Sequence, residues 1–139
     1  MTKRRLPQIV AAAVIEKDGR VLIAKRRQGS KLAGKWEFPG GKLEEGETPK
    51  QCLERELREE LAVIAEVGDF ICSSEYSYTP DWTIRLLAYR TTVISGIFNL
   101  NDHEEIRWVK PVDLVNYDFP EADKPIVERL IKEANAAII

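Results

Sequence analysis

Side chains that bind zinc are scarce in this sequence. It contains one histidine, His103, and two cysteines, Cys52 and Cys72, which are far apart and show neither metal-ligand nor disulfide spacing. A structural zinc site needs about four such ligands, so this composition excludes one. Two cysteines without a framework are typical of buried thiols in a reducing compartment, and the single histidine is expected on the surface.

Long apolar runs and a strong charge of either sign are also absent. The basic start and the apolar run 9–15 resemble a signal peptide, but a second apolar run at 20–26 favours a β-hairpin. No later run is long enough to span a bilayer. The net charge is only −2, so the chain as a whole has no electrostatic attraction to a negatively charged nucleic-acid polymer. We therefore expect a cytoplasmic protein without membrane or nucleic-acid partners.

The hydrophobic content that is present suits one folded domain. The 139 residues are 44% hydrophobic and 32% charged, without repeats or linkers, which predicts a single domain over residues 1–139. Helices are expected at 48–62 and from residue 124 onward, and strands at 8–15, 20–26, 66–78, 82–94 and 105–109. Because helices and strands do not alternate regularly, the pattern predicts an α/β protein with a mixed sheet flanked by helices.

Three glutamates, Glu56, Glu59 and Glu60, are crowded on one edge of the expected helix 48–62. Residues three and four apart are neighbours on a helix, and like charges there repel. One interpretation is a solvated face paired with nearby arginines. The long glycine-rich loop 27–47 favours another, because glycine lets backbone carbonyls approach and Mg²⁺ prefers oxygen ligands. We therefore expect a platform for a divalent cation.

The segment 41–63 resembles the Nudix box, which reads G-x5-E-x7-R-E-U-x-E-E-x-G-U with U an aliphatic residue. The matching positions are Gly41, Glu47, Arg55, Glu56, Leu57, Glu59, Glu60 and Val63. Ala62 stands where the family has a glycine that ends the helix, so we expect a shifted turn and little loss of function. The preceding EFPGG and the strand layout extend the resemblance over most of the chain.

The resemblance is strongest to the MutT branch of the family. It implies a Nudix-type α/β/α sandwich, hydrolysis of nucleoside triphosphates to monophosphate and pyrophosphate, and Mg²⁺ as cofactor, with Mn²⁺ as a substitute. Glu56 matches the base that activates water, Arg55 the residue that orients it, and Glu47 the partner of Arg55. The positions that match the family's metal ligands are Glu56, Glu59, Glu60 and the carbonyl of Gly40.

A further acid outside the box is common in this branch, shortly before a strand with a tryptophan. In NLNDHEEIRW the spacing back from Trp108 selects Asp102, with Glu104 and Glu105 as alternatives. A solvent-exposed loop is the other interpretation of this segment. Asp102 is therefore a candidate metal ligand that rests on spacing alone.

Three residues match positions that contact the nucleotide in MutT. Arg26 matches a residue that contacts the nucleotide, and the alternative is an ordinary surface charge. Phe38 matches a side chain that lines the base pocket, and the alternative is core packing. Asp123 matches an asparagine that reads oxidised guanine, and it is also a good helix N-cap. Ionised aspartate only accepts hydrogen bonds, which suits the cytosine amino group or the N7–H of oxidised guanine.

The resemblance predicts an enzyme that removes unwanted nucleotides from the cellular pool. Expected substrates are oxidised guanine nucleotides such as 8-oxo-dGTP, or cytidine-type and modified pyrimidine triphosphates. The alternatives are a dinucleoside-polyphosphate or ADP-ribose hydrolase and a catalytically silent nucleotide-binding module. The intact box favours an enzyme, because decayed modules lose a glutamate or the arginine.

Overall fold

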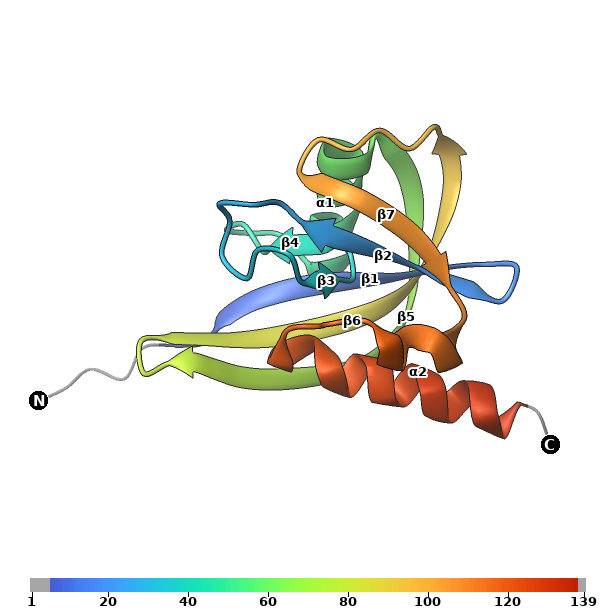
Figure 1. The fold of residues 1–139 in the computed structure, drawn as a ribbon. Coiled ribbons are helices and arrows are strands. Elements are labelled where there is room, and N and C mark those ends of the chain that lie inside the picture. The colour runs from blue at the N-terminus through green and yellow to red at the C-terminus, as the bar shows by residue number, and fades with distance from the viewer. Residues whose placement is uncertain (1–5, 138–139) are drawn as a thin grey trace, which may run out of the picture.

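The computed structural model describes residues 6–137, which form a mixed sheet between two helices. Figure 1 shows α1 and α2 on opposite sides of the strands, so the predicted sandwich is confirmed. The strands are β1 (Gln8–Lys17), β2 (Arg20–Arg26), β3 (Trp36–Glu37), β4 (Gly40–Lys42), β5 (Val63–Thr79), β6 (Trp82–Gly96) and β7 (His103–Val109). The helices are α1 (Pro49–Leu61) and α2 (Lys124–Ala136), with 3-10 turns η1 (Pro111–Asn116) and η2 (Glu121–Asp123).

β1 lies at the centre of the sheet. The strand order is β3-β2-β1-β6-β5, with β4 paired to β1 and β7 paired to β2. The β1–β6 pair is parallel, running from Gln8 opposite Ile84 to Ile15 opposite Thr91, and the other pairs are antiparallel. The predicted mixed sheet is therefore present.

Alternate residues of β1 supply two separate cores. Ala12 and Val14 belong to the core that packs under α2, whereas Ala11, Ala13 and Ile15 belong to the core that packs under α1. This alternation follows from the two-residue period of a strand. Because both faces of β1 are buried, its sequence is an unbroken apolar run. The pairing of β4 with β1 also places β4 beside α1.

The start of α1 forms as the sequence predicts. The Thr48 hydroxyl accepts from the Gln51 amide, and the Gln51 side chain accepts from the Thr48 amide. The residues of α1 that face the core are Cys52, Leu53, Leu57 and Leu61. At the other end Ala62 adopts a left-handed conformation with φ 59°, so the helix still ends here and the expected shift of the turn does not occur.

Several details differ from the sequence-based expectations. β1, β5, β6 and β7 are all longer than predicted. β5 and β6 form one long hairpin whose pairing continues beyond the buried part of the sheet. The loop 27–47 contains the short strands β3 and β4. Cys52 is buried as expected, but Cys72 is only half-buried. No helix within residues 6–137 is long and apolar enough to cross a membrane.

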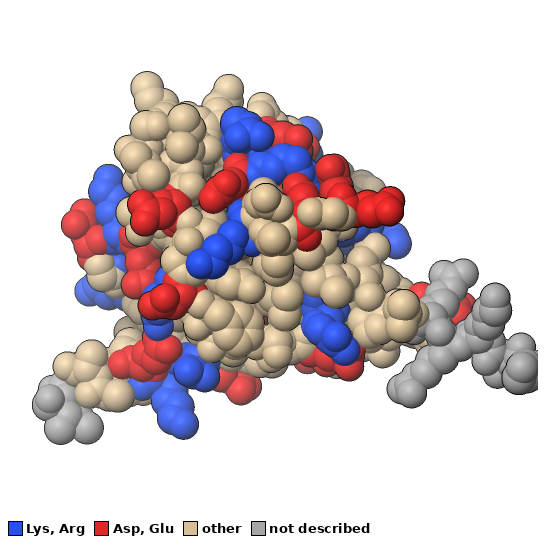
Figure 2. All heavy atoms as spheres, turned by 180° about the vertical axis from the view of Figure 1, so that it is seen from behind, with Lys and Arg blue, Asp and Glu red and all other residues tan. Residues whose placement is uncertain are grey.

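Charged side chains are mixed on the face opposite to the view of Figure 1. Figure 2 shows lysine and arginine beside aspartate and glutamate there, without a broad basic area. A broad basic area is the usual footprint of a protein that binds nucleic-acid polymers. The interspersed charges on this face agree with the small net charge of the chain.

Candidate active site

The two glycines of β4 bring the backbone unusually close to its neighbours. A Cβ on Gly40 would lie 1.9 Å from the carbonyl oxygen of Ala11, and a Cβ on Gly41 would lie 2.6 Å from Oε1 of Glu56. Any side chain at either position would collide with backbone or with the carboxylate. The glycines therefore allow β4 to pair with β1 on one side and to support Glu56 of α1 on the other.

Arg55 holds Glu56 and Glu47 in a fixed arrangement. Its Nε and Nη2 donate to the two carboxylate oxygens of Glu47 at 2.6 and 3.0 Å, and its Nη1 donates to Glu56 at 2.8 Å. The hydrogen bonds from Arg55 lower the pKa of Glu47 to about 2, with help from the backbone amide of Glu44. The two-pronged contact is the geometry that an arginine, but not a lysine, can provide.

Glu60 lies close to Glu56 in an environment that disfavours a second negative charge. Burial, followed by the neighbouring Glu56, raises the pKa of Glu60 to about 10, and the charges of Glu37 and Asp102 add to this. Its buried Oε2 atom has no hydrogen-bond partner. An unpartnered carboxylate oxygen beside a second carboxylate is the arrangement that a divalent cation would relieve.

The other predicted metal ligands lie further out. Glu59 is largely exposed, with 58% of its side chain accessible, and accepts from Nη1 of Arg55 at 3.2 Å. Asp102 is exposed and lines a second cavity together with Glu60. Within residues 6–137, no three acidic, histidine or cysteine side chains form a ready-made metal cluster. Glu56 and Glu60 are thus the pair that the fold brings together and that fits a divalent cation.

Buried His103 and half-buried Glu37 form a polar pair that the sequence does not reveal. His103 is 4% exposed, and its Nε2 lies 2.9 Å from Oε2 of Glu37. Nη1 of Arg26 donates to the other oxygen of Glu37 at 2.6 Å. The expectation of a surface histidine is wrong, because β7 pairs with β2, places His103 opposite Arg26 and brings its ring to Glu37. Only the strand pairing, which is not readable from the sequence, could have identified this group.

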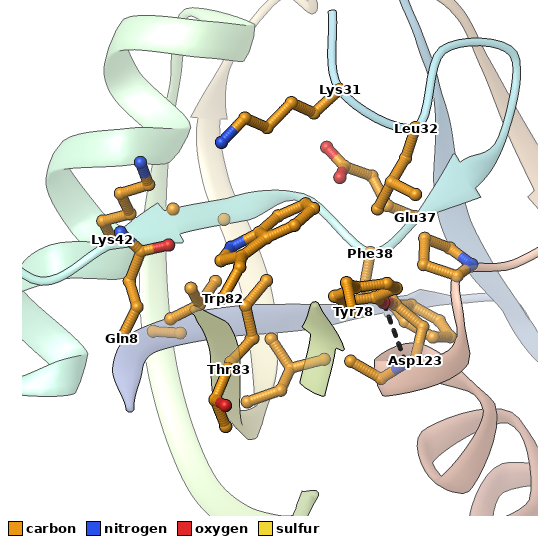
Figure 3. A pocket seen from close by; sticks show the side chains of 18 of the residues that line it. Gln8, Lys31, Leu32, Glu37, Phe38, Lys42, Tyr78, Trp82, Thr83 and Asp123 are labelled. Atoms are coloured by element: carbon orange, nitrogen blue, oxygen red, sulfur yellow. Dashed lines mark hydrogen bonds between the residues drawn. The ribbon is translucent and has the colours of Figure 1, made fainter. Parts of the chain in front are cut away.

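A cavity of about 670 Å³ connects the glutamates to the residues expected to contact the base. Glu56 and Glu60 line it together with Arg26, Phe38 and Asp123, and Figure 3 shows Phe38 and Asp123 on the same side of it. Phe38 is 3% exposed, so it is both a core residue and part of the lining. The structure thus gathers all three predicted nucleotide contacts into the cavity that also holds the carboxylates.

Asp123 is buried and does not cap α2. It is 8% exposed, its side chain makes no capping hydrogen bond, and its backbone is helical rather than extended. N-cap residues normally have extended backbone, so the N-cap interpretation is wrong. Burial, followed by the charge of Glu37, raises the pKa of Asp123 well above its ordinary value, against the opposing effects of the Phe38 amide and Arg26. This environment favours a neutral carboxyl group instead of the expected ionised one.

Comparison with known proteins identifies the family. The sequence model of the NUDIX domain family matches residues 5–130 of the chain. The chain belongs to the Nudix family and is a Nudix hydrolase. Its relatives include a CTP pyrophosphohydrolase from Escherichia coli K12, 39% identical over 119 residues that cover 86% of this chain and 87% of the relative. An 8-oxo-dGTP diphosphatase from the same organism is 32% identical over 123 residues, covering 88% and 95%.

Solved structures of related Nudix proteins have the same fold. The solution structure of the Escherichia coli ORF135 protein matches with a TM-score of 0.81 and 37% identity, covering 93% of this chain and 91% of that one. The MutT protein of methicillin-resistant Staphylococcus aureus 252 matches with a TM-score of 0.70 and 34% identity, covering 92% and 99%. The Nudix architecture therefore extends over nearly the whole chain.

Proposed function

We propose that this Nudix hydrolase cleaves nucleoside triphosphates to nucleoside monophosphate and pyrophosphate and so removes unwanted nucleotides from the cell's pool. Its preferred substrates carry a cytosine-type base or an oxidised guanine, as in 8-oxo-dGTP. The single observation that carries this proposal is the shared cavity, which has Glu56 and Glu60 in one part and Asp123 in another. A nucleotide has the same two-part chemistry, a polyphosphate joined to a hydrogen-bonding base.

At the glutamate end, Glu56 accepts the proton of the attacking water. Arg55 keeps the Glu56 carboxylate oriented, and Glu47 holds Arg55 in turn through two hydrogen bonds. Mg²⁺, for which Mn²⁺ would substitute, supplies positive charge that offsets the charge of the polyphosphate. The residues proposed to hold it are Glu56, Glu60 and the carbonyl of Gly40, with Glu59 and Asp102 at the exposed edge.

At the base end, a neutral Asp123 accounts for two kinds of substrate. A neutral carboxyl group donates one hydrogen bond and accepts another. Cytosine presents an acceptor beside its amino group, and oxidised guanine presents O6 beside the N7–H. The same side chain therefore pairs with either edge, with Phe38 against the ring and Arg26 nearby. The names of the relatives, a CTP pyrophosphohydrolase and an 8-oxo-dGTP diphosphatase, support this pair of substrates.

A pyrophosphate-release assay tests the proposal. Purified protein is incubated with cytosine, uracil, adenine and guanine triphosphates, oxidised or methylated where available, with Mg²⁺ and with excess chelator. We expect pyrophosphate from the cytosine and oxidised-guanine substrates, and only with the divalent cation. Equal turnover in chelator would contradict the metal-dependent chemistry. Hydrolysis of ADP-ribose or dinucleoside polyphosphates alone would assign the enzyme to another branch of the Nudix family. No hydrolysis of any nucleotide would favour a catalytically silent nucleotide-binding module.

A further inference from the structure

The mouth of the cavity carries an aromatic stack on the β5–β6 hairpin. Trp82 is the first residue of β6, and its ring centroid lies 4.7 Å from that of Tyr78 with an interplanar angle of 33°. Tyr78 in turn lies 4.9 Å from Tyr76 and accepts a hydrogen bond from the amide of Ala122. Trp82 is therefore packed against Tyr78, which is anchored by its hydrogen bond from Ala122, while the Trp82 side chain stays half-exposed.

Lys31 covers the Trp82 ring from the other wall of the cavity. Its Nζ atom lies 4.5 Å from the ring centroid, and Figure 3 shows the chain of Lys31 reaching toward Trp82 from the loop after β2. Nε of Arg26 donates to the backbone carbonyl of Lys31 at 2.7 Å, so the loop is anchored while the side chain is exposed. Within residues 6–137, Lys31 makes no ion pair, and its ammonium group is free to move to another partner.

A cation on an exposed aromatic ring is a weak contact, and a nucleobase stacked on the same ring is a stronger one. An anion entering the cavity also attracts the ammonium group, which lines the cavity and makes no ion pair with a described residue. A nucleotide supplies both groups at once, a flat base for the ring and a polyphosphate for the lysine. Replacing the contact between Lys31 and Trp82 by a base on Trp82 and a phosphate on Lys31 is therefore favourable for both side chains.

We propose that Trp82 is the surface on which the base of the substrate stacks, and that Lys31 leaves the ring for the polyphosphate when the nucleotide binds. This inference rests on the proposed function and extends it. Every base has a flat aromatic face, so stacking on Trp82 strengthens the binding of all substrates alike. Selection between bases is left to Asp123, which lines the same cavity.

Steady-state kinetics of Trp82→Leu and Trp82→Phe test the stacking. We expect Trp82→Leu to raise KM about tenfold for every substrate, with kcat kept, and Trp82→Phe to stay near the wild type. The matched control is Phe70→Leu, which removes an exposed aromatic ring from the same hairpin outside the cavity. An unchanged KM in Trp82→Leu, or an equal rise in Phe70→Leu, would overturn the inference.

Changing the ionic strength distinguishes the contribution of Lys31 to substrate binding from that of Trp82. Lys31→Met should raise KM a few-fold at low salt and lose this effect at high salt, because salt screens charge pairs. The effect of Trp82→Leu should not depend on salt. Thermal melting checks that each variant is folded. Equal salt dependence in both variants would contradict the assigned roles.

A binding measurement keeps this inference separate from the proposed function. If the wild type hydrolyses no triphosphate, the proposed function fails. Calorimetric titration with the non-hydrolysable α,β-methylene analogue of CTP then still compares the wild type with Trp82→Leu. Weaker binding by the variant would support stacking without catalysis, and equal binding would reject it.

Discussion

Glu56 occupies the space that a side chain on Gly41 would take. A Cβ at Gly41 would lie 2.6 Å from one oxygen of the Glu56 carboxylate and 2.8 Å from the other. The consecutive elements β4 and α1 thus fit together at this point because Gly41 has no side chain. This contact explains in physical terms why the motif begins with glycine.

Gly41→Ala should therefore inactivate the enzyme without unfolding it. The added methyl group displaces the Glu56 carboxylate from its place, and a misplaced catalytic group costs about a hundredfold in rate. Gly68→Ala is the matched control, because its Cβ would meet only the Arg90 carbonyl at 3.4 Å, an ordinary contact distance. Measuring kcat for both variants tests the loss of activity, and measuring the melting temperature tests whether each variant is folded. Full activity in Gly41→Ala would show that Glu56 can move without consequence.

Removing the charge of Glu56 or Glu60 should separate activity from stability. Either Glu→Gln variant should lower kcat roughly a hundredfold or more, as the loss of a key electrostatic group does. Because the pKa of Glu60 is raised to about 10, the metal-free native state keeps a proton that the unfolded state releases near pH 4.5. Glu60 thus lowers metal-free stability as pH rises from 4.5 toward 10.

Denaturant unfolding in chelator measures this stability difference. Glu60→Gln should be more stable than the wild type at pH 8, and the difference should shrink as pH falls from 8 toward 4.5. Glu54→Gln, an exposed position on the same helix, serves as the control and should change neither quantity. Loss of stability in Glu60→Gln with activity per folded molecule intact would indicate a structural role.

Asp123 should make base recognition depend on pH. Its raised pKa keeps the carboxyl group neutral, and the hydrogen-bond donor is lost as pH rises through that pKa. Asp123→Asn also offers a donor group, its NH2, beside an acceptor oxygen, but it does not titrate. The ratio of wild-type to variant kcat/KM on a cytosine triphosphate should therefore fall with rising pH.

The exposed Asp118, paired with Lys35 outside the cavity, provides the control variant Asp118→Asn. Its ratio to the wild type should be flat across the same pH range. A ratio that rises with pH for Asp123→Asn would mean that the ionised form reads the base. Unchanged base preference in Asp123→Ala would exclude Asp123 from recognition altogether.

Ala62→Gly should stabilise the protein without altering its activity. Alanine at φ 59° carries the steric cost of the left-handed region, about 1–2 kcal/mol, and glycine avoids it at a smaller entropic cost. The expected net gain is about 0.5–1 kcal/mol in the free energy of unfolding. Equilibrium unfolding in urea measures it. A loss of stability would show that the turn is held by contacts of the Ala62 methyl group.

The parts of the fold with strong local signals were predictable from the sequence. The capping box at Thr48 and Gln51, and leucines at every fourth position, located α1, and the box residues located Arg55 and Glu56. These features depend on neighbours a few residues apart. The spacing of the motif therefore contains most of the information about the glutamate end of the cavity.

The features that the sequence did not disclose depend on distant pairing. His103 is buried because β7 lies beside β2, and Asp123 is buried because η2 lies against the β5–β6 hairpin, where Tyr78 accepts from Ala122. His103 was expected on the surface, and Asp123 was expected to read the base or to cap a helix. Local propensity assigned Asp123 to a cap, whereas tertiary contacts decided its environment.

The parallel pairing of β1 with β6 sets an order of assembly during synthesis. β4 finds its partner on β1 within the first third of the chain, where Ala12 pairs with Gly40, and α1 follows directly. The parallel contact must wait until Thr91 has been made to pair with Ile15, and such long-range pairing is slow. Asp123 is made later still. Glu56 and Glu60, the proposed metal ligands, are therefore made well before Asp123, the residue proposed to read the base.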